Sequence, residues 1–261
     1  MISRRTGVWV LAAFTIAVIA GAVLAPRIPQ PQSYHHFADQ RSCLGIPNFG
    51  DVASNLLFAA AGVWGLIFLS TQRGHDQFLD ARERWAYILI FLGLLFTAFG
   101  STYYHLAPDN ERLVWDRLPM ALAFMGLVSA MISERVSVPA GFYLLLVLVL
   151  IGVGSVVWWW HTEAVGAGDL RFYAAVQVYA VLALPVLLLL PPRYTRSWDF
   201  AVVFGFYVLA KIFETEDRQI FSLDQHTISG HTLKHLAAGA AGFWVLMMLQ
   251  KREPHPAVVR A

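Results

Sequence analysis

The 261-residue chain has few charges and almost no cysteine. Only 14% of its residues are Asp, Glu, Lys or Arg, against about 25% in an ordinary soluble domain. So few charges cannot cover the surface of a globular protein in water, so most of the surface must face lipid. The single cysteine, Cys43, excludes both a disulfide framework and a zinc site built from thiolates. Any metal would have to be held by His, Asp and Glu.

The net charge of +2 is weak, and no block of Lys and Arg is present. A nucleic-acid partner is therefore not expected. The chain also shows neither a soluble second domain nor an internal repeat.

Apolar residues make up 57% of the chain and gather into long segments. A helix needs roughly 20 mostly apolar residues to cross a bilayer. Eight segments are candidates, the seventh being the shortest: Gly7–Ala25, Asp51–Ser70, Trp85–His105, Val114–Ser133, Val138–Trp160, Leu170–Leu190, Trp198–Glu214 and Ser229–Leu249. Because irregular backbone cannot face lipid, these segments predict an all-α polytopic membrane bundle.

The expected organisation is a seven-helix core with one extra N-terminal transmembrane helix. Residues 1–30 form an anchor, 31–50 an outer loop, 51–250 the catalytic core and 251–261 a cytoplasmic tail. The first apolar stretch could instead be a signal peptide, since Arg4 and Arg5 precede it. It is longer than a usual signal core, and Pro26 follows the only plausible cleavage site, so we favour an uncleaved anchor.

The distribution of Lys and Arg predicts the orientation. With eight spans, eleven of these residues fall on the side of the N-terminus and six on the other. The positive-inside rule then places both termini in the cytoplasm of an integral membrane protein, with a bacterial inner membrane as the expected location. The third span would end, and the fourth and eighth would begin, on the outer side.

Two histidines stand at the start of the eighth span, in SGHTLKHLAAG. His231 and His235 are four residues apart, which places them about 40° apart and roughly 6 Å along one helix face. This spacing allows one helix to offer two imidazoles to one metal ion. Alone, the pair could equally line a polar seam between helices.

Further polar residues lie at the ends of the third and fourth spans. Ser101 and His105 in GSTYYHLAP also share a helix face. Singly, a serine in a span usually bonds its own helix backbone, and a histidine at a helix end is usually interfacial. Asp116 in WDRLP could be only an N-terminal cap.

Together these residues indicate a catalytic metal site on the outer side. Ionisable groups within spans usually face the bundle interior and mark function. Three histidines with one open position are a catalytic zinc arrangement, and such a zinc lowers the pKa of its bound water to about 7. His105, His231 and His235 can be the ligands. Asp116 can accept the water's proton, and Ser101 can steady the developing oxyanion.

This pattern resembles the CREST superfamily, which includes alkaline ceramidases and the progestin/adipoQ receptors. The resemblance rests on Ser101-x-x-x-His105, on Asp116 eleven residues later, and on His231-x-x-x-His235 in the last helix. NFGDVASNLLF (Asn48–Phe58) is similar to the ceramidase branch, and SGHTLKHLAAG and FETEDRQIF (Phe213–Phe221) look like its bacterial members. The resemblance covers about two hundred residues.

The resemblance implies a zinc-dependent amide hydrolase that releases a fatty acid from a ceramide-like N-acyl lipid in the membrane. Two departures leave the substrate less defined than the chemistry. Tyr34–Asn48 has only Asp39 as an acid, so the calcium site of eukaryotic members is not expected, and the helix Gly7–Ala25 lies outside the seven-helix core.

Three other classes of protein remain open at this point. A receptor of the progestin/adipoQ type would use the same scaffold and also bind zinc. A bis-histidine haem protein would need His105 with one histidine of the eighth span and would leave the other unexplained. A proton-coupled transporter is weaker, because no span reads as a pair of half-helices.

Other polar residues are expected to be structural. Lys234 is predicted to pair with Glu214, Glu216 or Asp217 and to take no part in the site. Ser54 and Asn55 should form hydrogen bonds between helices, and Asp51 is a candidate helix cap. His226 is the additional histidine nearest to the predicted ligands, five residues before His231.

Overall fold

A computed structural model of the protein describes residues 2–256. The described residues form helices joined by turns, without a β-strand among them. The helices are α1 (Arg4–Leu24), η1 (Gln32–His35), α2 (Phe49–Ser54), α3 (Leu56–Ser70), α4 (Gln72–His75), η2 (Ala81–Glu83), α5 (Arg84–Leu106), α6 (Asn110–Arg135), α7 (Val138–Ala164), α8 (Arg171–Leu188), α9 (Asp199–Thr215), α10 (Asp217–Leu223) and α11 (Gly230–Lys251).

Seven helical segments of the described chain are long and apolar enough to cross a membrane. They are α1, α2 with α3, η2 with α5, α6, α7, α8 and α11. The protein is therefore an all-α integral membrane bundle, as the sequence predicted. α9 has 17 residues, is shorter than these segments and packs along α11. Its crossing of the bilayer stays a prediction.

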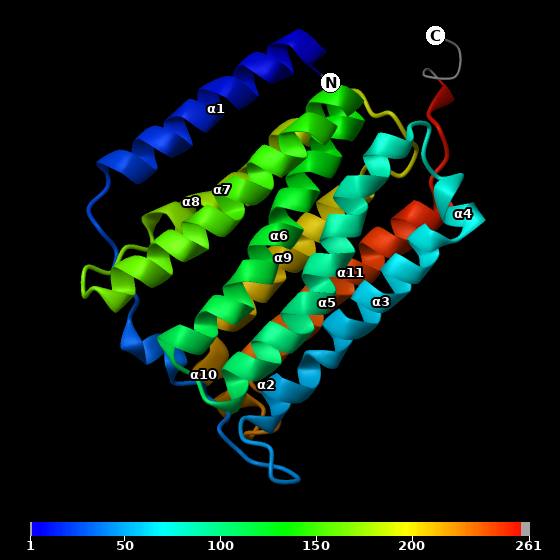
Figure 1. Ribbon diagram of the computed structural model, residues 1–261. Coiled ribbons are helices and arrows are strands. Elements are labelled where there is room, and N and C mark those ends of the chain that lie inside the picture. Colours follow the sequence, from blue (N-terminus) through cyan, green and yellow to red (C-terminus); the bar gives the residue numbers. More distant parts are fainter. Residues whose placement is uncertain (1, 257–261) are drawn as a thin grey trace.

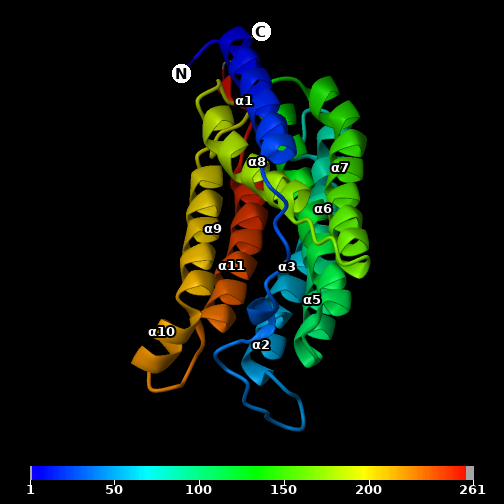
Figure 2. The same cartoon turned by 90° about the vertical axis from the view of Figure 1, so that its left-hand side faces the viewer.

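The core of the bundle is built from neighbouring helices that run side by side (Figure 1). α5 packs between α3 and α6, α6 packs against α7, and α9 packs against α11. Large apolar side chains such as Phe91, Met125 and Leu249 are fully buried between them. The extra helix α1 lies outside this core against α8 (Figure 2). The rings of Phe14 and Tyr179 stack there at 5.5 Å.

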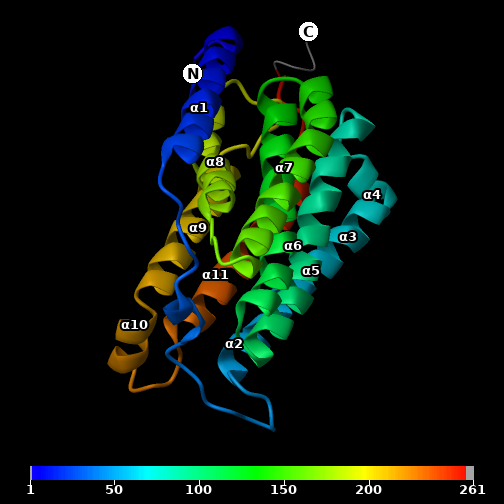
Figure 3. The same ribbon diagram turned by 60° about the vertical axis from the view of Figure 1, so that its left-hand side comes forward.

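One end of the bundle gathers the polar residues that the sequence singled out. α5 ends there, and α6 and α11 begin there, together with the short helices α2 and α10 (Figure 1). The segment between α1 and α2 runs along the bundle to the same end (Figure 3). We call this end the site end. It confirms the predicted grouping of the third, fourth and eighth spans.

The opposite end contains a second buried group of charges. α11 ends at Lys251, and Arg252, predicted to lie in a tail, is only 3% exposed. Its guanidinium forms an ion pair with Glu134 at 3.3 Å and stacks over the Tyr194 ring at 4.0 Å. These contacts tie the end of α11 to α6 and to the loop after α8. Residues 257–261 of the predicted tail lie outside the described part of the chain.

Candidate metal centre

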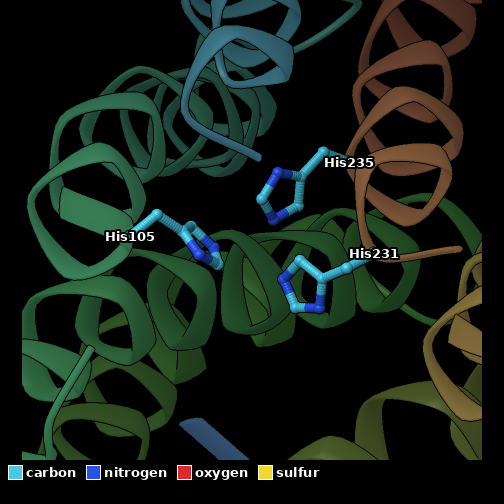
Figure 4. Close-up of side chains that lie close together, drawn as sticks. All are labelled: His105, His231 and His235. Atoms are coloured by element: carbon cyan, nitrogen blue, oxygen red, sulfur yellow. The ribbon is translucent and has the colours of Figure 1, made fainter. Parts of the chain in front are cut away.

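Three buried histidines meet at the site end. His105 lies in the last turn of α5, and His231 and His235 lie in the first two turns of α11. Their ring centroids are 4.8–5.0 Å apart, and one nitrogen from each ring lies within 4.8 Å of the other two. Figure 4 shows the three rings converging. The structure thus brings together the three predicted ligands, although more than a hundred residues separate α5 from α11.

A metal ion needs ring nitrogens that are not already hydrogen-bonded, and this cluster provides them. His105 Nδ1 and His231 Nε2 are buried and have no hydrogen-bond partner in the described chain. Leaving such an atom unpaired costs roughly 1–3 kcal/mol, so an orphaned pair calls for a ligand. The nitrogens of a tetrahedral zinc site lie about 3.3 Å apart when each bond is 2.0–2.1 Å. The ligand nitrogens of the three histidines lie within 4.8 Å of one another, so the cluster could hold a metal ion once the rings turn toward it.

The third histidine is oriented by groups that the sequence did not assign to the site. His235 Nδ1 lies 3.1 Å from the backbone oxygen of Asp51 and 2.9 Å from Ser54 Oγ. Because a carbonyl oxygen only accepts, Nδ1 must donate, and Nε2 is left bare for a metal. Ser54 forms this contact between helices as expected, whereas the Asn55 amide donates to the Asp51 backbone oxygen four residues before it. Asp51 is not a cap: it lies inside the first turn of α2, and its carboxylate accepts from Thr232.

The start of α11 is fixed by several contacts. Ser229 is the N-cap, and its hydroxyl accepts from the backbone N–H of Thr232 at 3.0 Å. The Asp217 carboxylate accepts from the backbone N–H of His231 at 2.7 Å. Gly230 is needed here, because a Cβ at this position would lie 2.3 Å from the backbone oxygen of Phe213. These contacts set the height and rotation at which the two histidines enter the bundle.

Asp116 and Ser101 lie beside the histidine cluster. Both are buried, and both line one cavity together with His235. α5 and α6 approach closely at this level, where a Cβ on Gly100 would lie 1.9 Å from the backbone oxygen of Trp115. Asp116 is not a helix cap, because α6 begins at Asn110 and is capped by Asp109. It lies nearly two turns inside α6 and lines the same cavity as Ser101, whose buried hydroxyl has no hydrogen-bond partner in the described chain.

The cavity continues from these residues into the apolar interior. Along α11 it is lined by Ala238, Ala241 and Val245, which lie on the same face as Lys234. With a rise of 1.5 Å per residue, the lining from Lys234 to Val245 extends about 16 Å. α5, α6, α8 and α9 supply the other walls, which are almost wholly apolar. The site thus opens into a long apolar cavity within the bundle.

A segment of the loop between α1 and α2 covers the cluster at its other side. We call residues 30–41 the cover segment. The Phe37 ring lies 4.6 Å from the His105 ring and 4.4 Å from the His231 ring, and Phe37 is only 5% exposed. The backbone N–H of Ala38 donates to Asp217 at 2.9 Å. Phe37 therefore separates the histidines from the water beyond this end of the bundle.

The cover segment is held down by further polar contacts. His35 bonds the Tyr104 hydroxyl and Asn110, each at 2.9 Å. Tyr34 donates to Glu214 at 3.3 Å, and its burial raises the pKa of its hydroxyl. Arg41 donates to both oxygens of Asp39 and so lowers the pKa of that carboxyl. Sequence reasoning placed these residues in an outer loop and gave them no part in the site.

Two remaining sequence predictions concern Lys234 and His226. Lys234 forms an ion pair with Glu214 at 2.7 Å, as predicted. Its side chain also lines the cavity that contains Asp116, which was not expected. His226 is exposed, packs against the Phe221 ring and is not in the histidine cluster.

The geometry of the site is that of three imidazoles beside a carboxylate, a hydroxyl and an apolar cavity. Such an arrangement can hold one metal ion and bring an apolar molecule next to it. No family model matches the chain, and no curated protein matches it. What the site does must therefore be argued from its own residues.

Proposed function

We propose that the protein is a zinc-dependent intramembrane amide hydrolase that releases a fatty acid from a ceramide-like N-acyl lipid. The observation that supports this most is a cluster of three histidines, one of which, His235, lines an apolar cavity together with Asp116 and Ser101. The resemblance to the alkaline ceramidase branch, carried by the same five residues, supports the same reaction.

Zinc is the metal that this ligand set fits best. The three side chains are imidazoles without a thiolate, and three protein ligands leave one position open for chemistry. When bound, zinc supplies a Lewis acid that polarises a carbonyl and lowers the pKa of water to about 7. His105, His231 and His235 would hold it, and Ser54 and the Asp51 backbone would keep His235 in the required tautomer.

Asp116 has the position expected of the proton carrier. Its carboxylate lies in the cavity wall, so it can accept a proton from the attacking water and return it to the departing amine nitrogen. Ser101 lines the same cavity from α5. It can donate a hydrogen bond to the oxygen of the amide carbonyl as negative charge develops there.

The cavity supports a lipid as substrate. A chain lying against Ala238, Ala241 and Val245 would be surrounded by apolar side chains for about 16 Å, with its carbonyl end at His235. Phe37 covers the cluster on the side away from the cavity. The substrate would therefore reach the site from the membrane rather than from water.

The orientation proposed from the Lys and Arg distribution predicts which side of the membrane the site end faces. With both termini in the cytoplasm of a bacterial inner membrane, the site end faces the outer side. The cover segment would then separate the histidines from the outer aqueous space.

The geometry speaks against a haem. The ring centroids of His105 and His231 are 4.9 Å apart, which leaves no room for a porphyrin between them. A receptor of the progestin/adipoQ type would hold the same metal, so only turnover distinguishes it from a hydrolase.

Turnover by the purified protein tests the proposal. The protein in lipid nanodiscs is expected to release fatty acid from a ceramide-like lipid. Asp116→Asn should keep the metal and lose at least about 100-fold in turnover, because the proton acceptor is removed. Asp199→Asn is the matched control, since Asp199 pairs with Arg196 in the first turn of α9, outside the cavity. Full turnover by Asp116→Asn would remove Asp116 from the mechanism, and metal binding without any lipid turnover would favour the receptor.

A further inference from the structure

Lys234 is a cation at the mouth of the apolar cavity. It lies between the two histidines of α11, and its side chain is 13% exposed. Lys234 lines the cavity together with His235, Asp116 and Ser101. A charge in this position costs free energy unless it serves a partner. The contacts of its ammonium group therefore indicate which charge a ligand in the cavity should carry.

The ammonium of Lys234 is only partly used by the protein. It makes one hydrogen bond within the described chain, to Glu214 Oε1 at 2.7 Å. An ammonium has three N–H donors, so two remain for another acceptor. The other oxygen of Glu214 is bonded by Lys211, and Tyr34 also donates to this carboxylate. Glu214 is therefore shared among three donors, and it leaves two N–H donors of the Lys234 ammonium without an acceptor among the described residues.

A neutral lipid amide offers no negative charge to complement the Lys234 ammonium. Asp116 lines the same cavity as Lys234, but the proposed reaction needs its carboxylate for proton transfer. An anionic group on the substrate would complement Lys234 without engaging Asp116. A carboxylate one carbon from the amide nitrogen would lie close to the scissile bond, and Lys234 lines the same cavity as His235.

We propose that Lys234 binds a carboxylate on the amine half of the substrate, so that N-acyl amino acids are preferred over neutral N-acyl lipids. This inference rests on the proposed hydrolase function and specifies its substrate class. In the reaction, the amide C–N bond breaks and water supplies the new C–O bond. The fatty acid leaves with that oxygen, and the amino acid nitrogen takes a proton from Asp116. Lys234 is a specificity residue in this scheme and transfers no proton.

Binding measurements on Asp116→Asn protein test the inference without turnover. The ligands are N-palmitoylglycine, its neutral isostere N-palmitoylglycinamide, and palmitate. The carboxylate is expected to bind about 10- to 100-fold more tightly than the amide, as for a hydrogen bond to a charged group. Adding Lys234→Met should abolish this ratio, whereas adding Lys234→Arg should keep most of it and show that the fold tolerates a change at this position.

Lys211→Met is the matched control, because Lys211 pairs with the same Glu214 but does not line the cavity. It should leave the ratio unchanged. Equal binding of N-palmitoylglycine and its amide, or a ratio that survives Lys234→Met, would overturn the inference. Palmitate binding that depends on Lys234 as strongly as N-palmitoylglycine binding would assign the lysine to the released fatty acid and would also overturn it.

Turnover separates this inference from the proposed function. With the native Asp116, cleavage of ceramide-like lipids without any preference for N-palmitoylglycine would leave the hydrolase standing and reject the role of Lys234. Carboxylate-selective binding that depends on Lys234, without cleavage of any amide, would support the binding site and reject the hydrolase.

Discussion

Ser54→Ala is expected to weaken the metal site without removing a ligand. Ser54 Oγ lies 2.9 Å from His235 Nδ1 and also donates to the Asp51 backbone oxygen at 3.0 Å. Nδ1 therefore has two acceptors, the serine and the Asp51 backbone oxygen. Losing a group that orients a metal-ligating histidine typically costs 10- to 100-fold in metal affinity.

The expected loss lies at the lower end of that range, because the Asp51 oxygen remains as an acceptor. We expect the zinc dissociation constant of Ser54→Ala to rise about 10-fold, or about 1.4 kcal/mol. Competition with a fluorescent zinc chelator measures it on purified protein. Ser155→Ala is the matched control, because Ser155 is also buried and bonds a backbone oxygen, but in α7. Unchanged affinity in Ser54→Ala, or an equal loss in Ser155→Ala, would refute the reasoning.

Further predictions concern the opposite end of the bundle and the cover segment. Glu134→Gln leaves Arg252 buried without its ion-pair partner and should destabilise the protein by about 3 kcal/mol. The unfolding midpoint should fall while the zinc affinity stays unchanged. An unaltered midpoint would show that the pair is not stabilising. Phe37→Ala exposes the histidines at the site end and should speed the removal of zinc by a water-soluble chelator at least about 10-fold. Phe99→Ala, on the exposed face of α5, should leave that rate as it is, and equal rates in the two variants would argue against a covering role.

The helices and the metal ligands follow from the sequence because both have local signals. Apolar runs of bilayer length predict the spans, and a spacing of four residues places His231 with His235 on one helix face. The match between α5 and α11 followed from counting spans, since each crossing reverses the direction of the chain. Helix ends were less certain: Asp109 and Pro108 carry the signal for the start of α6, and Asp116 lies beyond it.

The cover segment could not be predicted in the same way. Phe37 reaches the histidines through a loop without periodicity, so nothing in the sequence fixes its direction. Lys234 illustrates a second limit. Its pairing with Glu214 follows from charge, but its place in the cavity wall depends on how α11 is rotated against α6 and α9. That rotation is set in part by the contacts of Gly230 with Phe213 and of His231 with Asp217, which the spacing of residues along α11 does not reveal.

The metal content of the purified protein tests the central claim most directly. The wild-type protein should carry roughly one zinc per chain, and His105→Ala and His231→Ala should each lose most of it, because three histidines from two distant helices form one site. His226→Ala, which changes an exposed histidine outside the cluster, should retain it. A zinc content below about half an equivalent in the wild type, with no difference in His105→Ala and His231→Ala, would contradict the account.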